Sequence, residues 1–413
     1  MDSYLQEGYR RISDSMEQKI LIIHSTDRNI ERNFWGYFFQ SCGIWYKSRG
    51  FGMKSSELDE GYKEMYLINP DDMGRISQTD PDAVYVLNEK PKEIMKNICY
   101  FTWQEPETYV SILNALFPEE PYMGELLHCF LKHNMWRNSW FYHELPHTLS
   151  GFIAKTILDG CKNLIEHLQS LKTLSKESQW HRDFMILYCR YLGLGISWDY
   201  DSLEFIKNQS LLKDCKDMEE SYGKSLSLWL MTAKISYLSP ITRPNVLKYL
   251  RMILKIDTTA NICYLIGLQC DVIYGNYELA KRYWQQGYQL DSNFFPLCYL
   301  KARILQQNNK YYEAVALFNR VIEFIQGDGE YSFSNVSEIM FLYHSMERIA
   351  DIAEFYYNNK HMQDHMTVQM ELLKKTLNDY FEFLNTCMAC ISTDSFTKDF
   401  FHKGLEMIQK KLM

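Results

Sequence analysis

Two short motifs in the chain pair residues that could bind a metal ion. The first is His143-Glu144-Leu145-Pro146-His147, which spells HExxH. On a helix this spacing places two imidazoles on one face, where they bind zinc while the glutamate activates a water molecule for proteolysis. Pro146 lies between the histidines, however, and a proline inside a helix costs about 3 kcal/mol. We therefore expect a loop that leads into a helix near Thr148, and a zinc metalloprotease, with a third ligand such as Glu166, is a remote alternative.

The second motif is Cys387-Met388-Ala389-Cys390, a lone CxxC in a helical context. A zinc site needs a second pair of ligands, and a redox dithiol needs a strand-to-helix turn. Neither accompanies this motif, so we expect two packed thiols. His128 and His133 are five residues apart, which rotates them off a common helix face, and we interpret them as ordinary surface or core residues. We expect no metal and no cofactor.

Other catalytic motifs are missing from the sequence. It contains no GxxxxGK[ST] phosphate loop and no GxSxG nucleophile turn, and Gly193-Leu194-Gly195 does not complete a dinucleotide fingerprint. Whether the protein is an enzyme stays open, and we lean towards no.

The composition indicates a folded, acidic protein. Hydrophobic residues make up 46% and charged residues 23%, and the formal net charge of -8 disfavours a nucleic-acid partner. No apolar run is long enough to cross a bilayer and no signal peptide opens the chain, so we expect no membrane partner and a cytoplasmic location. Eleven cysteines, an odd number, are best explained as reduced core thiols.

The distribution of proline divides the chain. Seven of the ten prolines lie in the first 146 residues, and long helices exclude proline. We predict an α/β domain at 1–120, a connecting segment at 121–149 and an all-α domain at 150–413. In the first domain, five β-rich runs alternate with helix candidates, which predicts a small doubly wound parallel sheet. The runs are Lys19 to His24, Ile44 to Tyr46, Met65 to Ile68, Ala83 to Leu87 and Ile98 to Phe101.

The first of these runs ends at a turn. Ser25-Thr26-Asp27 can cap a helix in which Phe34 and Phe38 recur at i+4 spacing, and Gly43 ends that helix.

The all-α part contains an internal repeat, whose period is about 34 residues. Gly275-Asn276-Tyr277-Glu278-Leu279-Ala280 recurs as Asn309-Lys310-Tyr311-Tyr312-Glu313-Ala314. Tyr277 therefore pairs with Tyr311 and Ala280 with Ala314, while Trp284 and Phe318 fill the space one turn later. These residues resemble the tetratricopeptide repeat, whose helical hairpins stack into a solenoid. A worn copy precedes them at Pro244 to Ile253, and we expect four to six hairpins.

The tetratricopeptide resemblance implies a binding groove and close helix packing. Leu268 and Ala302 fall where that family prefers a small residue. First-helix residues Gln269, Tyr299, Arg303 and Gln306 would face the groove; the alternative is that each contacts neighbouring hairpins.

The run from Ile20 to Arg28, with the helix and the Cys42-Gly43-Ile44-Trp45-Tyr46 segment after it, resembles the opening of a TIR domain. Flavodoxin-like and receiver domains share this outline. Enzymatic TIR domains hydrolyse NAD with a glutamate on the helix after the third strand, but Pro70 to Pro81 contains aspartates and no glutamate. A receiver would need acidic residues where this chain has His24-Ser25 and Asn69. The resemblance therefore implies a docking module.

Together these patterns predict a cytoplasmic adaptor that binds a peptide or partner protein. The second hypothesis is a TIR-type, NAD-degrading sensor-effector of bacterial signalling or defence, in which Glu57, Glu60 or Glu64 would be required. The sequence indicates nothing about the oligomeric state.

Overall fold

The computed structural model describes residues 17–25, 27–52, 59, 61–76, 80, 82–91, 97–102, 105–120, 122–133, 150–171, 175–195, 202–326, 336–358 and 406. The chain forms two compact units, one made of 1–136 with 154–291 and the other of 137–153 with 292–413. The first unit thus contains both the sheet and the helices up to Asp291, whereas the predicted limits at 120 and 150 separate sheet from helices. Each unit is described by itself below.

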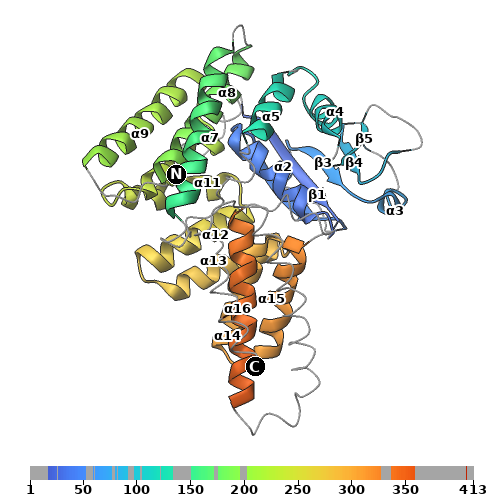
Figure 1. The fold of residues 1–413 in the computed structure, drawn as a ribbon, viewed down its shortest axis with the longest axis vertical. Coiled ribbons are helices and arrows are strands. Elements are labelled where there is room, and N and C mark those ends of the chain that lie inside the picture. The colour runs from blue at the N-terminus through green and yellow to red at the C-terminus, as the bar shows by residue number, and fades with distance from the viewer. Residues whose placement is uncertain are drawn as a thin grey trace. The chain divides into compact units, whose positions relative to one another are not determined.

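A five-stranded parallel sheet forms the centre of the first unit's α/β part (Figure 1). The strands are β1 (Lys19–His24), β2 (Trp45–Gly50), β3 (Lys63–Leu67), β4 (Val84–Leu87) and β5 (Ile98–Tyr100), in the order β2-β1-β3-β4-β5. Each pairing is parallel, and β1 lies between β2 and β3. The predicted parallel sheet is confirmed. This order places the switch point of the doubly wound arrangement between β1 and β3.

The helix after β1 packs on the sheet through a row of aromatic residues. Helix α2 (Asn29–Ser41) buries Phe34, Trp35 and Phe38. Their rings contact Phe101 after β5 and Phe130, with Phe34 6.1 Å from Phe101 and Phe38 5.5 Å from Phe130 between centroids. Large rings at i and i+4 spacing supply the apolar face that the sequence predicted.

The sequence-based prediction is wrong for the start of α2 and correct for its end. The N-cap position is Arg28, with no side-chain cap, so the capping role predicted for the Ser25-Thr26-Asp27 turn is wrong as far as the described residues go. The Ser25 hydroxyl instead donates to Asp72. At the other end the prediction is confirmed, because Gly43 adopts the left-handed φ of 72° just after the helix.

Of the remaining helices of the first unit, one lies between β3 and β4 and the others follow β5. Those near the sheet are α3 (Pro70–Met73), α4 (Pro106–Leu116) and α5 (Tyr122–Lys132). The others are α7 (Ser150–Ser170), α8 (Lys176–Gly195), α9 (Ser202–Tyr222), α10 (Leu226–Tyr237), the 3-10 turn η2 (Arg243–Asn245), α11 (Val246–Ile256), α12 (Ala260–Leu268), the π-helical turn η3 (Gln269–Ile273) and α13 (Tyr277–Leu290). Helix α10 packs on α11, and α12 packs on α13.

Helix α8 joins the helical part of the first unit to the sheet part, since it packs on both α2 and α5. Gly43 allows this contact: a Cβ atom there would lie 2.6 Å from the ring of Phe184. His181, also on α8, donates from Nδ1 to the carbonyl oxygen of Cys42 at 2.7 Å. Burial lowers the pKa of His181 to about 4, so the imidazole is neutral at physiological pH.

The second unit contains three described helices, α14 (Phe295–Gln307), α15 (Tyr311–Gln326) and α16 (Val336–Asn358). Helix α15 packs on both α14 and α16. The core between them is aromatic, with the ring of Tyr299 5.6 Å from Phe318 and 5.3 Å from Phe341.

Two further properties concern the described part of the chain as a whole. Its nine cysteines are all buried and none forms a disulfide bond, as the sequence predicts for core thiols. Within the described ranges no helix has the length and apolar character required to traverse a lipid bilayer.

Candidate functional site

The repeat found in the sequence is present in the structure as a repeated pattern of burial. Ala280 and Ala314 are both fully buried, and Trp284 and Phe318 are buried one turn later. Tyr277 and Tyr311 both lie half-buried at the first position of their helices. Tyr277 packs its ring on Trp284 at 6.0 Å, and Tyr311 packs on Phe355 at 5.0 Å. The alanine and the large residue one turn later are therefore buried equivalently in α13 and α15, whereas the two tyrosines have different ring partners, one on α13 itself and one on α16.

The turn before each of these helices repeats as well. Gly275 and Asn309, which occupy equivalent positions of the two repeats, both have a φ of 59°. Glycine and asparagine are the residues that adopt this left-handed conformation most readily. Each turn is followed by the same backbone hydrogen bond into the second helix, from Ala280 to Asn276 and from Ala314 to Lys310. The repeat read from the sequence is thus a repeat of backbone geometry.

The close approach between helices falls one residue away from its sequence-based position. Leu268 was assigned to it, but the residue without room for a side chain is Gly267, whose Cβ would lie 2.1 Å from Trp284 Nε1. The π-helical turn η3 explains the offset, because a π turn accommodates one residue more than an α turn. In the next hairpin α14 has no such turn, and Ala302 is fully buried at its assigned place.

The four residues assigned to a groove lie in different environments. Gln269 is buried in η3 of the first unit. Tyr299 is buried in the second unit, where it contacts α15 and α16, which is the alternative of contact with neighbouring helices. Arg303 and Gln306 are half-buried on α14.

Two aspartates separated by one repeat period attach the helical part of the first unit to strand β2. Asp257 and Asp291 are the C-cap residues of α11 and α13, both in extended backbone conformation. Asp257 accepts hydrogen bonds from Trp45 Nε1 and the Tyr62 hydroxyl. Asp291 accepts one from the Ser48 hydroxyl at 2.7 Å. Equivalent positions of consecutive hairpins therefore bind one strand, at positions three residues apart.

Charged partners complete these two contacts. Lys47 Nζ lies 3.6 Å from the Asp257 carboxylate, and Arg32 Nη1 lies 3.7 Å from that of Asp291. Both aspartates are buried, and a buried carboxylate requires such a cation or several hydrogen bonds. Sequence reasoning missed this pair, although two aspartates spaced by the repeat period were a signal that could have found it.

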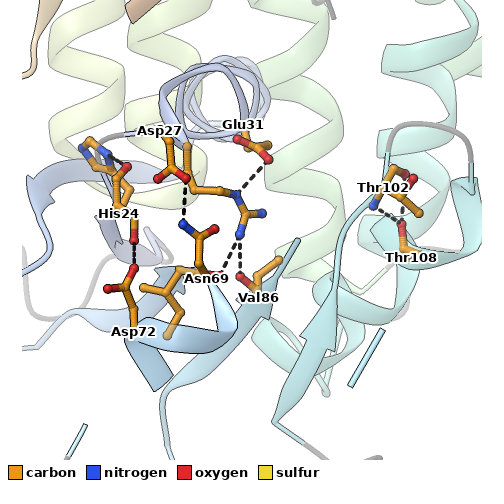
Figure 2. Close-up of polar contacts among 11 residues, drawn as sticks. His24, Asp27, Glu31, Asn69, Asp72, Val86, Thr102 and Thr108 are labelled. Atoms are coloured by element: carbon orange, nitrogen blue, oxygen red, sulfur yellow. Dashed lines mark hydrogen bonds and ion pairs between the residues drawn. The ribbon is translucent and has the colours of Figure 1, made fainter. Parts of the chain in front are cut away.

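The carboxyl edge of the sheet is where doubly wound folds bind their ligands, and here its polar groups bind one another (Figure 2). The Ser25 hydroxyl after β1 donates to Asp72 on α3 at 2.6 Å. The Asn69 amide after β3 donates to Asp27 at 2.7 Å. These bonds link the two loops on either side of the switch point.

Arg28 fills the space beneath these loops. Its side chain is fully buried, and Nη1 donates to the carbonyl oxygens of Ile68 at 2.9 Å and Val86 at 3.1 Å. Nε donates to Glu31 at 2.8 Å, which neutralises the buried charge. The guanidinium thus lies across the ends of β3 and β4, in the crevice itself.

His24, the last residue of β1, is also buried at this edge, and its Nδ1 lies 3.1 Å from the Ser25 carbonyl oxygen. Burial, assisted by the charge of Arg32, lowers the pKa of His24 to about 4. The imidazole is therefore neutral in the folded protein.

The residues of the enzymatic alternatives are only partly described. Glu64 lies on β3, where it accepts a hydrogen bond from Tyr66 at 2.7 Å and pairs with Arg49 at 3.6 Å. Glu64 is the second residue of β3, near the amino end of the strand, and therefore lies away from the carboxyl edge, which begins after Leu67. Glu57, Glu60, the HExxH motif at 143–147 and the CxxC motif at 387–390 lie outside the described residues.

Comparison of the chain with protein-family models, with curated proteins and with solved structures found no match.

Proposed function

We propose that the protein is an adaptor that binds a polypeptide partner through tetratricopeptide-like hairpins, with its α/β module acting in docking. The observation that carries this proposal is the repeat of burial and turn geometry between α13 and α15, at the period read from the sequence. Hairpins of this period stack into a solenoid that binds peptides in tetratricopeptide proteins. An adaptor of this kind acts in the cytoplasm.

Exposed apolar side chains at the hairpin turns of the first unit support a binding role. Ile241, in the turn between α10 and α11, is 70% exposed. Val272 and Tyr274, in the turn between α12 and α13, are 58% and 52% exposed. Covering large apolar groups that face water lowers the free energy, so a partner that buries these side chains is favoured. We refer to these three residues, which lie in two separate turns, together as the turn patch.

The carboxyl edge of the sheet supports docking over catalysis. A ligand in the crevice would have to displace the Arg28 guanidinium from Ile68 and Val86 and separate Ser25 from Asp72. Arg28 Nη1 and Nε and the Ser25 hydroxyl are already bonded to protein partners, although Arg28 Nη2 has none among the described residues. Breaking a buried charged hydrogen bond costs about 1.5–3 kcal/mol.

The test is a selection of binding peptides from a displayed random library against the intact purified chain. We expect an enriched apolar consensus whose synthetic peptide binds in the micromolar range. The combined variant Ile241→Ser, Val272→Ser, Tyr274→Ser should weaken that binding about 10-fold or more. Val110→Ser, which removes another exposed apolar side chain, on α4 and outside the turn patch, is the matched control and should bind as the parent does.

Two results would overturn the proposal. One is a library that yields no binding peptide, or peptides that bind the turn-patch variant unchanged. The other is release of nicotinamide when the intact chain is incubated with NAD, with turnover abolished by Glu64→Gln, since this would establish the NAD-degrading alternative.

A further inference from the structure

Three side chains with metal-binding atoms converge between α5 and α7. Glu125 and Cys129 are one turn apart on α5, which places them on one face of the helix. His167 on α7 lies opposite, with Nε2 3.7 Å from Glu125 Oε1 and 3.7 Å from Cys129 Sγ. The three ligand atoms all lie within 4.8 Å of one another.

These separations approach those of a tetrahedral zinc site. With Zn–S of about 2.3 Å and Zn–N and Zn–O of about 2.0–2.1 Å, tetrahedral angles give ligand–ligand separations of roughly 3.4–3.6 Å. The two separations that involve His167 Nε2 are each within about 0.3 Å of these values. The third, between Glu125 and Cys129, is within 4.8 Å, so rotation of the exposed Glu125 side chain by about 1 Å closes the triad to that geometry. A Cys–His hydrogen bond and a Glu–His ion pair would explain the two contacts separately, and Cys129 Sγ also lies 3.8 Å from Nδ1 of His167. A bound ion explains in one step why all three ligand atoms converge on one point.

The surroundings fit a bound cation. Cys129 is fully buried, while the side chains of His167 and Glu125 are 25% and 45% exposed, so an ion can enter from the carboxylate side. A thiolate and a carboxylate together carry two negative charges, which balance a divalent ion. The donor set of sulfur, imidazole nitrogen and carboxylate oxygen is one that zinc accepts.

His133 lies beside the triad and is the candidate for a fourth ligand. It directly follows α5 and lies four residues after Cys129, and its amide continues the helical hydrogen bonding to the Cys129 carbonyl oxygen at 3.1 Å. His133 is therefore in line with Glu125 and Cys129. Its ring lies edge-on to that of His167 with centroids 6.1 Å apart. The Nε2 atom of His133 is buried, and it has no hydrogen-bond partner within the described part of the chain.

We propose that Glu125, Cys129 and His167 bind a zinc ion, with His133 as the fourth ligand. The ion has a structural role, because it ties the helix that follows the sheet to the first long helix of the all-α region. Coordination releases the Cys129 proton, so zinc affinity rises with pH.

The experiment uses the intact chain, stripped with a chelator and titrated with Zn²⁺ by calorimetry and with Co²⁺ by absorbance. We expect one equivalent of Zn²⁺, and a Co²⁺ complex that shows tetrahedral bands with a thiolate charge-transfer band. Cys129→Ser and His167→Gln should each lower the affinity by at least ~100-fold. Cys129→Ser should also remove the thiolate charge-transfer band, and His167→Gln the tetrahedral bands.

Two matched controls lie on α7. Cys161→Ser changes another buried cysteine, and Glu166→Gln changes the exposed carboxylate next to His167. Both should bind metal as the parent does. To separate loss of binding from loss of folding, the thermal midpoint of each variant is measured with and without Zn²⁺: the parent and the controls should rise on addition of metal, and Cys129→Ser should not. The proposal is overturned if the stripped chain binds no stoichiometric metal, or if binding survives Cys129→Ser, which would place the ion elsewhere.

Discussion

Replacing Gly267 by alanine probes the packing on which the hairpin depends. The added Cβ would lie 2.1 Å from Nε1 and 2.4 Å from Cδ1 of Trp284. The indole is only 4% exposed, so it has no free space into which to move. Displacing it also breaks the hydrogen bond from Nε1 to the Tyr264 carbonyl oxygen at 3.3 Å.

These terms give the expected magnitude for Gly267→Ala. Overpacking costs about 1–3 kcal/mol and the lost hydrogen bond about 1 kcal/mol. The higher helix propensity of alanine returns about 1 kcal/mol. We therefore expect a net destabilisation of about 2 kcal/mol, or a fall of roughly 4–8 °C in the midpoint of thermal unfolding of the first unit. Tryptophan fluorescence during heating and in urea measures it.

The control for this prediction is Gly124→Ala on α5. There the nearest atom to the new Cβ is Val110 Cγ1 at 3.6 Å, an ordinary contact, so stability should be unchanged or slightly higher. A second arm combines Gly267→Ala with Trp284→Leu; because the smaller side chain relieves the clash, the double variant should be more stable than the sum of the two single changes implies. Equal stability of Gly267→Ala and Gly124→Ala would refute the reasoning.

Two further predictions concern the contact of helix α8 with the segment around Gly43. In urea unfolding, Gly43→Ala should destabilise the fold by about 1–3 kcal/mol more than Gly52→Ala. Both glycines have a positive φ, 72° and 84°, so both variants carry the same backbone strain. Only the Cβ at Gly43 meets Phe184, whereas nothing lies within 4 Å of a Cβ at Gly52. The folded-state pKa of His181 lies below its unfolded value of about 6.5, so its stabilising contribution is complete above that pH and is lost as pH falls towards 4, by up to about 1.4 kcal/mol per pH unit. His181→Gln should flatten this part of the stability–pH curve, leaving the share due to His24; an unchanged slope would contradict the assignment.

The sheet could be predicted because its signals are local. The run Lys19 to His24 is apolar over consecutive residues, as a strand between two neighbours must be, and it coincides with β1. The other four strands were found within a few residues of their ends; β2, for example, extends to Gly50 through the polar residues Lys47, Ser48 and Arg49. Lys47 and Ser48 bind Asp257 and Asp291 of the helical part of the unit, and Arg49 binds Asp59 and Glu64. Apolar patterning does not detect such polar contacts.

The hairpin repeat was also visible, since Tyr277 and Tyr311 belong to motifs that match in order and spacing. Its close contact was assigned one residue too late because counting in whole repeat periods assumes uniform α-helices. The π turn at Gln269–Ile273 breaks that assumption. The cap predicted at Ser25 is absent because its hydroxyl donates to Asp72, 47 residues away, and not to a nearby helix amide. Such a distant partner is not visible from local sequence.

The converging ligand atoms of Cys129 and His167 were beyond sequence reasoning. They are 38 residues apart on different helices, and no spacing rule connects them. Only the packing of α5 and α7 in three dimensions brings them within reach of one ion.

The attachment of Asp257 and Asp291 to β2 affects how the chain can be dissected. A fragment starting at residue 150 would lack Trp45, Ser48 and every other sheet partner of the two carboxylates. Side chains that are 4% and 1% exposed in the intact protein would then meet solvent together with the apolar surface around them. Truncation at the change of fold class should therefore yield aggregation-prone material, and the smallest unit worth expressing retains the sheet.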